Sequence, residues 1–77
     1  MCFDKIKELI VEIISCSEDE VTMETNMKED LGIDSLDAME LAMSVQDNLG
    51  VEIPEDKLAE MVYVKDVVNF VDEHLEK

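Results

Sequence analysis

The sequence predicts an all-α fold, a small four-helix bundle with three longer helices, one short helix between the second and the last, and a long first loop. The prediction rests on apolar residues that recur at spacings of three and four over separate stretches. It rests also on helix-start and helix-stop signals at Asp34, Gly50 and Pro54. A length of 77 residues predicts a single domain, residues 1–77, with a small core.

The first helix is expected from Phe3 to about Ser15. Its apolar residues follow the helical period, and charged residues occupy the solvent side. The apolar set comprises Phe3, Ile6, Leu9, Ile10, Ile13 and Ile14. Because β-branched residues lower helix propensity, packing against the rest of the chain must hold this helix.

The stretch from Cys16 to Asp34 has no clear period and is long for a plain loop. We expect an ordered connection that joins two helices and then presents Ser35. The side chains expected to attach it to the core are Val21, Met23, Met27, Leu31 and Ile33.

The second helix is expected to span Ser35–Leu49. Asp34 can cap its first N–H groups, with Asp37 near a capping-box position, and Gly50 ends it. Ser35 then lies at the first helical position, at the positive end of the helix dipole, with its hydroxyl toward water. That position suits a side chain that carries a phosphodiester.

This helix carries two apolar stripes at about 100° per residue. The core stripe holds Ala38, Leu41, Ala42, Val45 and Leu49. The second stripe, on roughly the opposite side, holds Leu36, Met39 and Met43 among the acids Asp37, Glu40 and Asp47. Burial of the helix on two sides would explain the second stripe. A docking surface would also explain it, because methionines adapt to partners and acids orient them.

The segment Val51–Pro54 is expected to be extended, because the residue before proline avoids the helical region. A short helix then runs from Pro54 or Glu55 to about Met61, with Leu58 and Met61 inward. The last helix runs from about Val64 to Leu75, with Phe70 at the edge of its apolar face. That face holds Val64, Val67, Val68, Val71 and Leu75.

The charge of the chain argues against several functions. Acidic residues outnumber basic ones by 21 to 6, and the formal net charge is −15. This balance opposes nucleic acid binding and attraction to anionic membranes, and it favours basic protein partners. No apolar run suits a membrane span and no signal peptide is recognised, so we expect no membrane insertion and a cytoplasmic location.

Cys2 and Cys16 flank the first helix, which would separate them by about 20 Å. A disulfide needs Cα atoms within about 7 Å, so both thiols are expected to be free.

No catalytic constellation is visible, and we expect no enzyme activity. Ser35 has no candidate base, because His74 is distant in sequence and is expected at the surface. No Gly-rich phosphate loop is present. The acids around Asp30 and Asp34 do not match an EF-hand loop, so no specific metal site is expected, only weak divalent binding by this pair.

The most specific signal is the run that leads into the second helix, which reads Asp30-Leu31-Gly32-Ile33-Asp34-Ser35-Leu36. With Val51–Pro54 and the short acidic chain, it resembles the acyl carrier protein family. The resemblance covers nearly the whole chain and is densest from Glu29 to Pro54. It implies that a transferase moves 4′-phosphopantetheine from coenzyme A onto Ser35, with Mg²⁺ needed only during attachment. The arm would carry acyl groups as thioesters.

The same resemblance assigns partner-binding residues. Asp34 matches a position that helps to bind the metal of the phosphopantetheinyl transferase. The partner-recognition positions are Leu36, Asp37, Met39, Glu40 and Met43, with Asp47 on the acidic edge of the same stripe. The implied partners are that transferase and enzymes of acyl transfer and fatty acid synthesis with basic patches. A monomer is expected.

Two matters stay open at this point. Many relatives place a capping Thr where this chain has Tyr63, so the start of the last helix is uncertain. The acidic second helix and the Ile53-Pro54 pair favour the fatty-acid-synthesis type. A polyketide, peptidyl or alanyl carrier, and an acidic helical adaptor that is never modified, are the alternatives.

Overall fold

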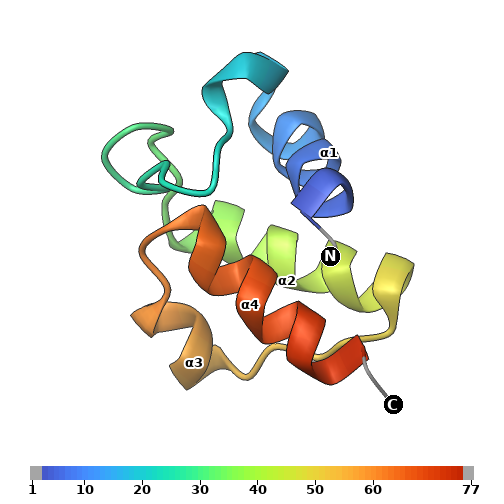
Figure 1. The fold of residues 1–77 in the computed structure, drawn as a ribbon. Coiled ribbons are helices and arrows are strands. Elements are labelled where there is room, and N and C mark those ends of the chain that lie inside the picture. The colour runs from blue at the N-terminus through green and yellow to red at the C-terminus, as the bar shows by residue number, and fades with distance from the viewer. Residues whose placement is uncertain (1–2, 76–77) are drawn as a thin grey trace.

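Four α-helices make up the fold in the computed structural model, which describes residues 3–75 (Figure 1). They are α1 (Phe3–Ile14), α2 (Ser35–Leu49), α3 (Glu55–Glu60) and α4 (Val64–Leu75). Helix α1 packs against α2 and α4, and α2 also packs against α3. No strand occurs within residues 3–75, where an isolated bridge pairs Asn26 with Tyr63. The predicted all-α fold with one short helix is confirmed.

Helix α1 packs against the core with its predicted apolar face. Ile6, Leu9 and Ile10 are buried, while the other three apolar residues of that face are partly buried. The helix ends at Ile14, and Ser15 adopts a left-handed φ of 56° just after it.

The long first connection is ordered and attached to the core, as predicted. Val21, Met27 and Ile33 are buried, and Met23 and Leu31 pack partly buried against them. The connection also contains a short 3₁₀ helix, η1 (Glu18–Glu20), which sequence reasoning missed. Its three consecutive acids carry no apolar period that could have indicated it.

Helix α2 has the predicted limits because both of its ends carry the expected caps. The Asp34 Oδ1 atom accepts a hydrogen bond from the Asp37 N–H at 3.0 Å. Gly50 adopts a left-handed φ of 71°, and its N–H donates to the Gln46 carbonyl at 3.0 Å. The core stripe is confirmed, since Leu41 and Val45 are buried and the other members pack against the core.

Helix α4 begins at Val64, although Tyr63 offers no capping oxygen. Asp66, in the first turn, accepts hydrogen bonds at Oδ2 from the N–H groups of Val62 and Tyr63, at 3.2 and 3.1 Å. This carboxylate therefore supplies the part of a capping box that reaches back to the residues before the helix.

The first connection supplies the remaining acceptors at the start of α4. Backbone carbonyls of the connection take up N–H groups that the first turn of a helix leaves without partners. The hydrogen bonds run from Val64 N–H to Thr25 O and from Lys65 N–H to Met23 O, each at 3.0 Å. In the opposite direction, the Met27 N–H of the connection donates to Val62 O at 2.8 Å. The connection is thus fixed to the same end of the molecule as α4.

At the C-terminal side, one prediction for α4 is wrong, and the predicted end of α3 agrees with the structure to within one residue. Leu75 was expected on the buried face of α4, but 42% of its surface is exposed. Glu73 and His74 are exposed beside it, so the buried face of α4 ends at Val71. Helix α3 ends at Glu60, and Met61 is buried just beyond it.

None of the helices in the described range 3–75 has both the length and the apolar character that a bilayer span requires.

Candidate functional site

Ser35 is the first residue of α2 and is exposed. The turn before it is set by Gly32, whose φ of 69° lies in the left-handed region that glycine favours. Ile33 follows and is buried, and its N–H donates to the Met27 carbonyl at 2.9 Å. The chain is therefore fixed to the core two residues before Ser35, which positions the Ser35 backbone at the surface.

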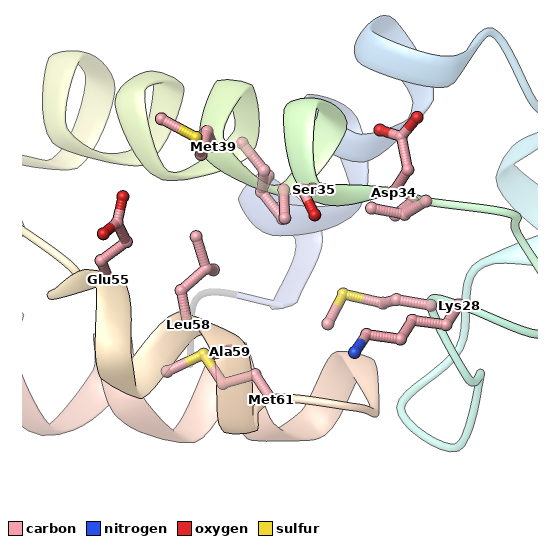
Figure 2. Close-up of a pocket in the computed structure, with 12 residues that line it drawn as sticks. Lys28, Asp34, Ser35, Met39, Glu55, Leu58, Ala59 and Met61 are labelled. Carbon is pink, nitrogen blue, oxygen red and sulfur yellow. The ribbon is translucent and has the colours of Figure 1, made fainter.

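A cavity of about 570 Å³ opens beside Ser35 between α2 and α3 (Figure 2). Its walls are mostly apolar, with Ile33, Ala38, Leu41, Leu58 and Met61 among them. Figure 2 shows the Ser35 hydroxyl directed toward the cavity and the Asp34 carboxylate directed away from it. Sequence reasoning missed this cavity, although it placed Leu58 and Met61 on the inner side.

Asp34 and Asp30, the predicted weak cation pair, are both engaged in the turn. Asp34 is exposed next to Ser35 while Oδ1 caps α2. Asp30 Oδ2 accepts from the Asn26 N–H at 2.9 Å. Across residues 3–75 no cluster of three or more His, Cys, Asp or Glu side chains could hold a metal ion. Weak binding by this pair stays a prediction.

The second stripe of α2 is exposed. The exposed fractions are 74% for Leu36, 45% for Met39 and 63% for Met43, so the helix is not buried on two sides. Met39 also lines the cavity, which the stripe pattern did not indicate. The acids on this side are Asp37, which is half-buried, and the exposed Glu40 and Asp47.

The other reactive side chains lie outside this site. His74 is exposed, stacks on Phe70 with ring centroids 4.2 Å apart, and has Nδ1 2.8 Å from the Phe70 carbonyl oxygen. Cys16 is a free, partly buried thiol, as predicted. Burial and then the Glu20 carboxylate raise the pKa of this thiol, which disfavours the reactive thiolate. Cys2 lies outside the described residues.

Comparison with known proteins matches this arrangement to a family. The family model described as "Phosphopantetheine attachment site" matches residues 4–71. The acyl carrier protein of Clostridium perfringens (strain SM101 / Type A) is 47% identical over 75 residues, which cover 97% of this chain and 99% of the relative. The acyl carrier protein of Campylobacter lari is 45% identical over 97% of this chain and 96% of the relative. That of Campylobacter fetus subsp. fetus is 43% identical over 91% of each.

The family model and the relatives together define a carrier with a covalently attached 4′-phosphopantetheine prosthetic group. With relatives of this identity over nearly the full length, the chain belongs to the acyl carrier protein family. Its function is to carry acyl groups.

Proposed function

We propose that the chain carries acyl intermediates of fatty acid synthesis on an arm attached through Ser35. The observation that carries the proposal is the position of Ser35, exposed at the first residue of α2 and on the wall of an apolar cavity. A serine that only capped a helix would need neither the exposure nor the cavity.

The residues around Ser35 fit the group. The start of α2 favours the negative charge of a phosphodiester on the serine oxygen, because backbone N–H groups point toward it. The bound arm supplies a terminal thiol that holds acyl groups as thioesters. The cavity offers shelter to a hydrocarbon chain, and each CH₂ group removed from water contributes about 0.8 kcal/mol.

Attachment needs a second protein. A phosphopantetheinyl transferase would use coenzyme A and Mg²⁺, with Mg²⁺ needed only at this step. Asp34 is proposed to contact the metal of the transferase. Its carboxylate is exposed and directed away from the cavity (Figure 2), so it is open to a partner.

The exposed stripe of α2 is the proposed docking surface for the transferase and for synthesis enzymes with basic patches. Leu36, Met39 and Met43 offer adaptable apolar contact. Asp37, Glu40 and Asp47 would steer and orient a basic partner. Tethering raises the effective concentration of the acyl group at the active site of the partner, so the chain itself need catalyse nothing. We propose that the protein is a monomer and binds no nucleic acid. We also propose that it works in the cytoplasm, where coenzyme A is available.

The alternatives differ in their loading enzymes. A polyketide, peptidyl or alanyl carrier would use the same serine but accept other acyl groups. The acidic α2 surface and the similarity to relatives called acyl carrier protein favour the fatty-acid-synthesis type. Loading by a malonyl transferase, compared with adenylating loading enzymes, separates the fatty-acid and polyketide types from the peptidyl and alanyl types.

The proposal is tested by the intact mass of the chain after incubation with coenzyme A and a phosphopantetheinyl transferase. The wild-type chain and Ser44→Ala, a control on the same helix, should each gain the mass of one arm. Ser35→Ala should gain none and should keep its helical content, because the side chain is exposed and the Asp34 cap remains. A mass gain in Ser35→Ala would refute the attachment site.

A further inference from the structure

We propose that Lys28 is a positioning residue that holds the phosphodiester on Ser35 and so keeps the arm beside the cavity. This inference rests on Ser35 as the attachment site. It concerns a side chain that lies in the loop before α2, outside the docking surface defined by the exposed stripe.

Lys28 is the one basic residue that lines the cavity in the described part of the chain, and it shares this lining with Ser35. The other charged residues of the lining are Asp34 and Glu55. All six basic residues of the sequence are lysines, and the charge of the whole chain is −15. A cation in the lining of the cavity that Ser35 shares is therefore unusual for a chain of this charge.

The backbone brings Lys28 to the attachment residue. The hydrogen bond from Ile33 N–H to the Met27 carbonyl, at 2.9 Å, closes the loop between them. Lys28 directly follows Met27, and Asp34 and Ser35 directly follow Ile33, so the hydrogen bond brings the backbones of these neighbours close together. Asn26 Oδ1 accepts from the Lys28 N–H at 2.9 Å, which fixes the backbone from which the lysine side chain leaves.

The ammonium group is free to take up an anion. Lys28 forms no ion pair with the residues that the structure describes, whereas Lys7 lies 3.9 Å from Glu18. Figure 2 shows the Lys28 stem running along the cavity and ending in its nitrogen. A lysine commonly lays its methylenes on apolar surface and keeps its charge in water. The flexible stem therefore lets the charge move to a nearby anion.

A phosphodiester on Ser35 adds a negative charge to a region that already holds Asp34 and Asp37. The Lys28 ammonium offsets part of that repulsion through a charge-assisted contact with the phosphate oxygens. The contact also draws the first atoms of the arm toward the side of the cavity on which Lys28 lies. An acyl chain at the end of the arm then begins close to the apolar walls.

The test compares how far modification of Ser35 lowers the melting temperature in variants of equal net charge. Melting temperatures are measured for unmodified and fully modified forms of wild type, Lys28→Gln, Lys28→Arg and Lys65→Gln. Lys65 is exposed on α4 over the Tyr63 ring and does not line the cavity, so its variant has the same net charge as Lys28→Gln. Intact mass verifies complete modification, and circular dichroism verifies that each variant is folded.

In Lys28→Gln, modification should lower the melting temperature by roughly 2 °C more than in wild type, the scale of one exposed ion pair in a domain of this size. Lys65→Gln and Lys28→Arg should behave as wild type. The difference should vanish in about 1 M NaCl, where the Debye length is about 3 Å. In NMR spectra, the Lys28 Cε–Hε resonance should move on modification of wild type while that of Lys65 stays in place.

The inference would be overturned if modification lowered the melting temperature equally in Lys28→Gln and Lys65→Gln. It would also be overturned if the Lys28 resonance did not move on modification. Lack of any mass gain on Ser35 is a separate result, which would overturn the attachment site itself.

Discussion

Small side chains shape the cavity beside Ser35. Ala38 on α2 and Ala59 on α3 both line it, and neither fills the space that a larger side chain would occupy. Ala59 is also exposed, so it lies toward the open side of the cavity. A change in side-chain volume at this position should alter the cavity without disturbing the core.

Ala59→Phe should therefore reduce the stabilisation that long acyl chains give to the protein. In wild type the melting temperature should rise as the attached chain lengthens from two to eight carbons, because each buried CH₂ group contributes about 0.8 kcal/mol. In Ala59→Phe this rise should be much smaller. Lys57→Phe is the control, since Lys57 is exposed on α3 and does not line the cavity. A rise that is the same in both variants would show that the acyl chain lies elsewhere.

At the scale of single residues, the sequence predicted the features that depend only on neighbouring residues. The cap at Asp34 and the exposure of Ser35 follow from residue types at fixed spacing. The cavity was not predictable in that way. It depends on how residues of α2 and α3, distant in sequence, leave space between them, and a residue pattern does not report unfilled volume.

At the scale of elements, α2 combines three tasks on different sides. Its core stripe packs on the bundle, its first turn presents Ser35, and its exposed stripe is available to partners. The 3.6-residue period separates the two stripes, which explains why the sequence indicated both of them. Helix α4 begins at Val64, as expected, but the carbonyls of Thr25 and Met23 that accept from its first N–H groups were not predicted, because they lie in the connection. Such long-range hydrogen bonds leave no local signal.

Glu40→Lys should slow association with basic partner enzymes by roughly tenfold at low ionic strength and should flatten the dependence of the rate on salt. Asp37→Lys should act in the same direction. Glu12→Lys is the control, because Glu12 is exposed on α1 and makes the same change in net charge. Stopped-flow association rates are the measurement. If Glu40→Lys and Glu12→Lys slow association equally, the effect belongs to net charge and α2 is not the docking surface.

At the scale of the whole molecule, charge opposes compactness. The chain has 21 acids and 6 bases, and its small core consists mainly of aliphatic and methionine side chains. Self-repulsion destabilises a compact state, and a domain of this size has little stability in reserve. Five of the acids cluster around the start of α2, namely Glu29, Asp30, Asp34, Asp37 and Glu40.

Salt should therefore raise the melting temperature from its value at low ionic strength, because the Debye length falls to about 8 Å at physiological ionic strength. MgCl₂ should raise it further than NaCl at matched ionic strength, through carboxylates such as Asp30 and Asp34. Thermal melts in both salts provide the measurement. A melting temperature that responds to neither salt would contradict the role of repulsion. Equal rises in melting temperature with NaCl and MgCl₂ would support repulsion but would rule out weak cation binding by Asp30 and Asp34.

The central claim is that Ser35 carries the arm, and its most direct test is fragmentation of the modified chain in a mass spectrometer. Fragments that begin at the N-terminus and end before Ser35 should have unmodified masses. Those that extend past Ser35 should all carry the added mass, and complementary C-terminal fragments should gain it only when they include Ser35. An added mass located at Ser15, Ser17 or Ser44 would contradict the claim.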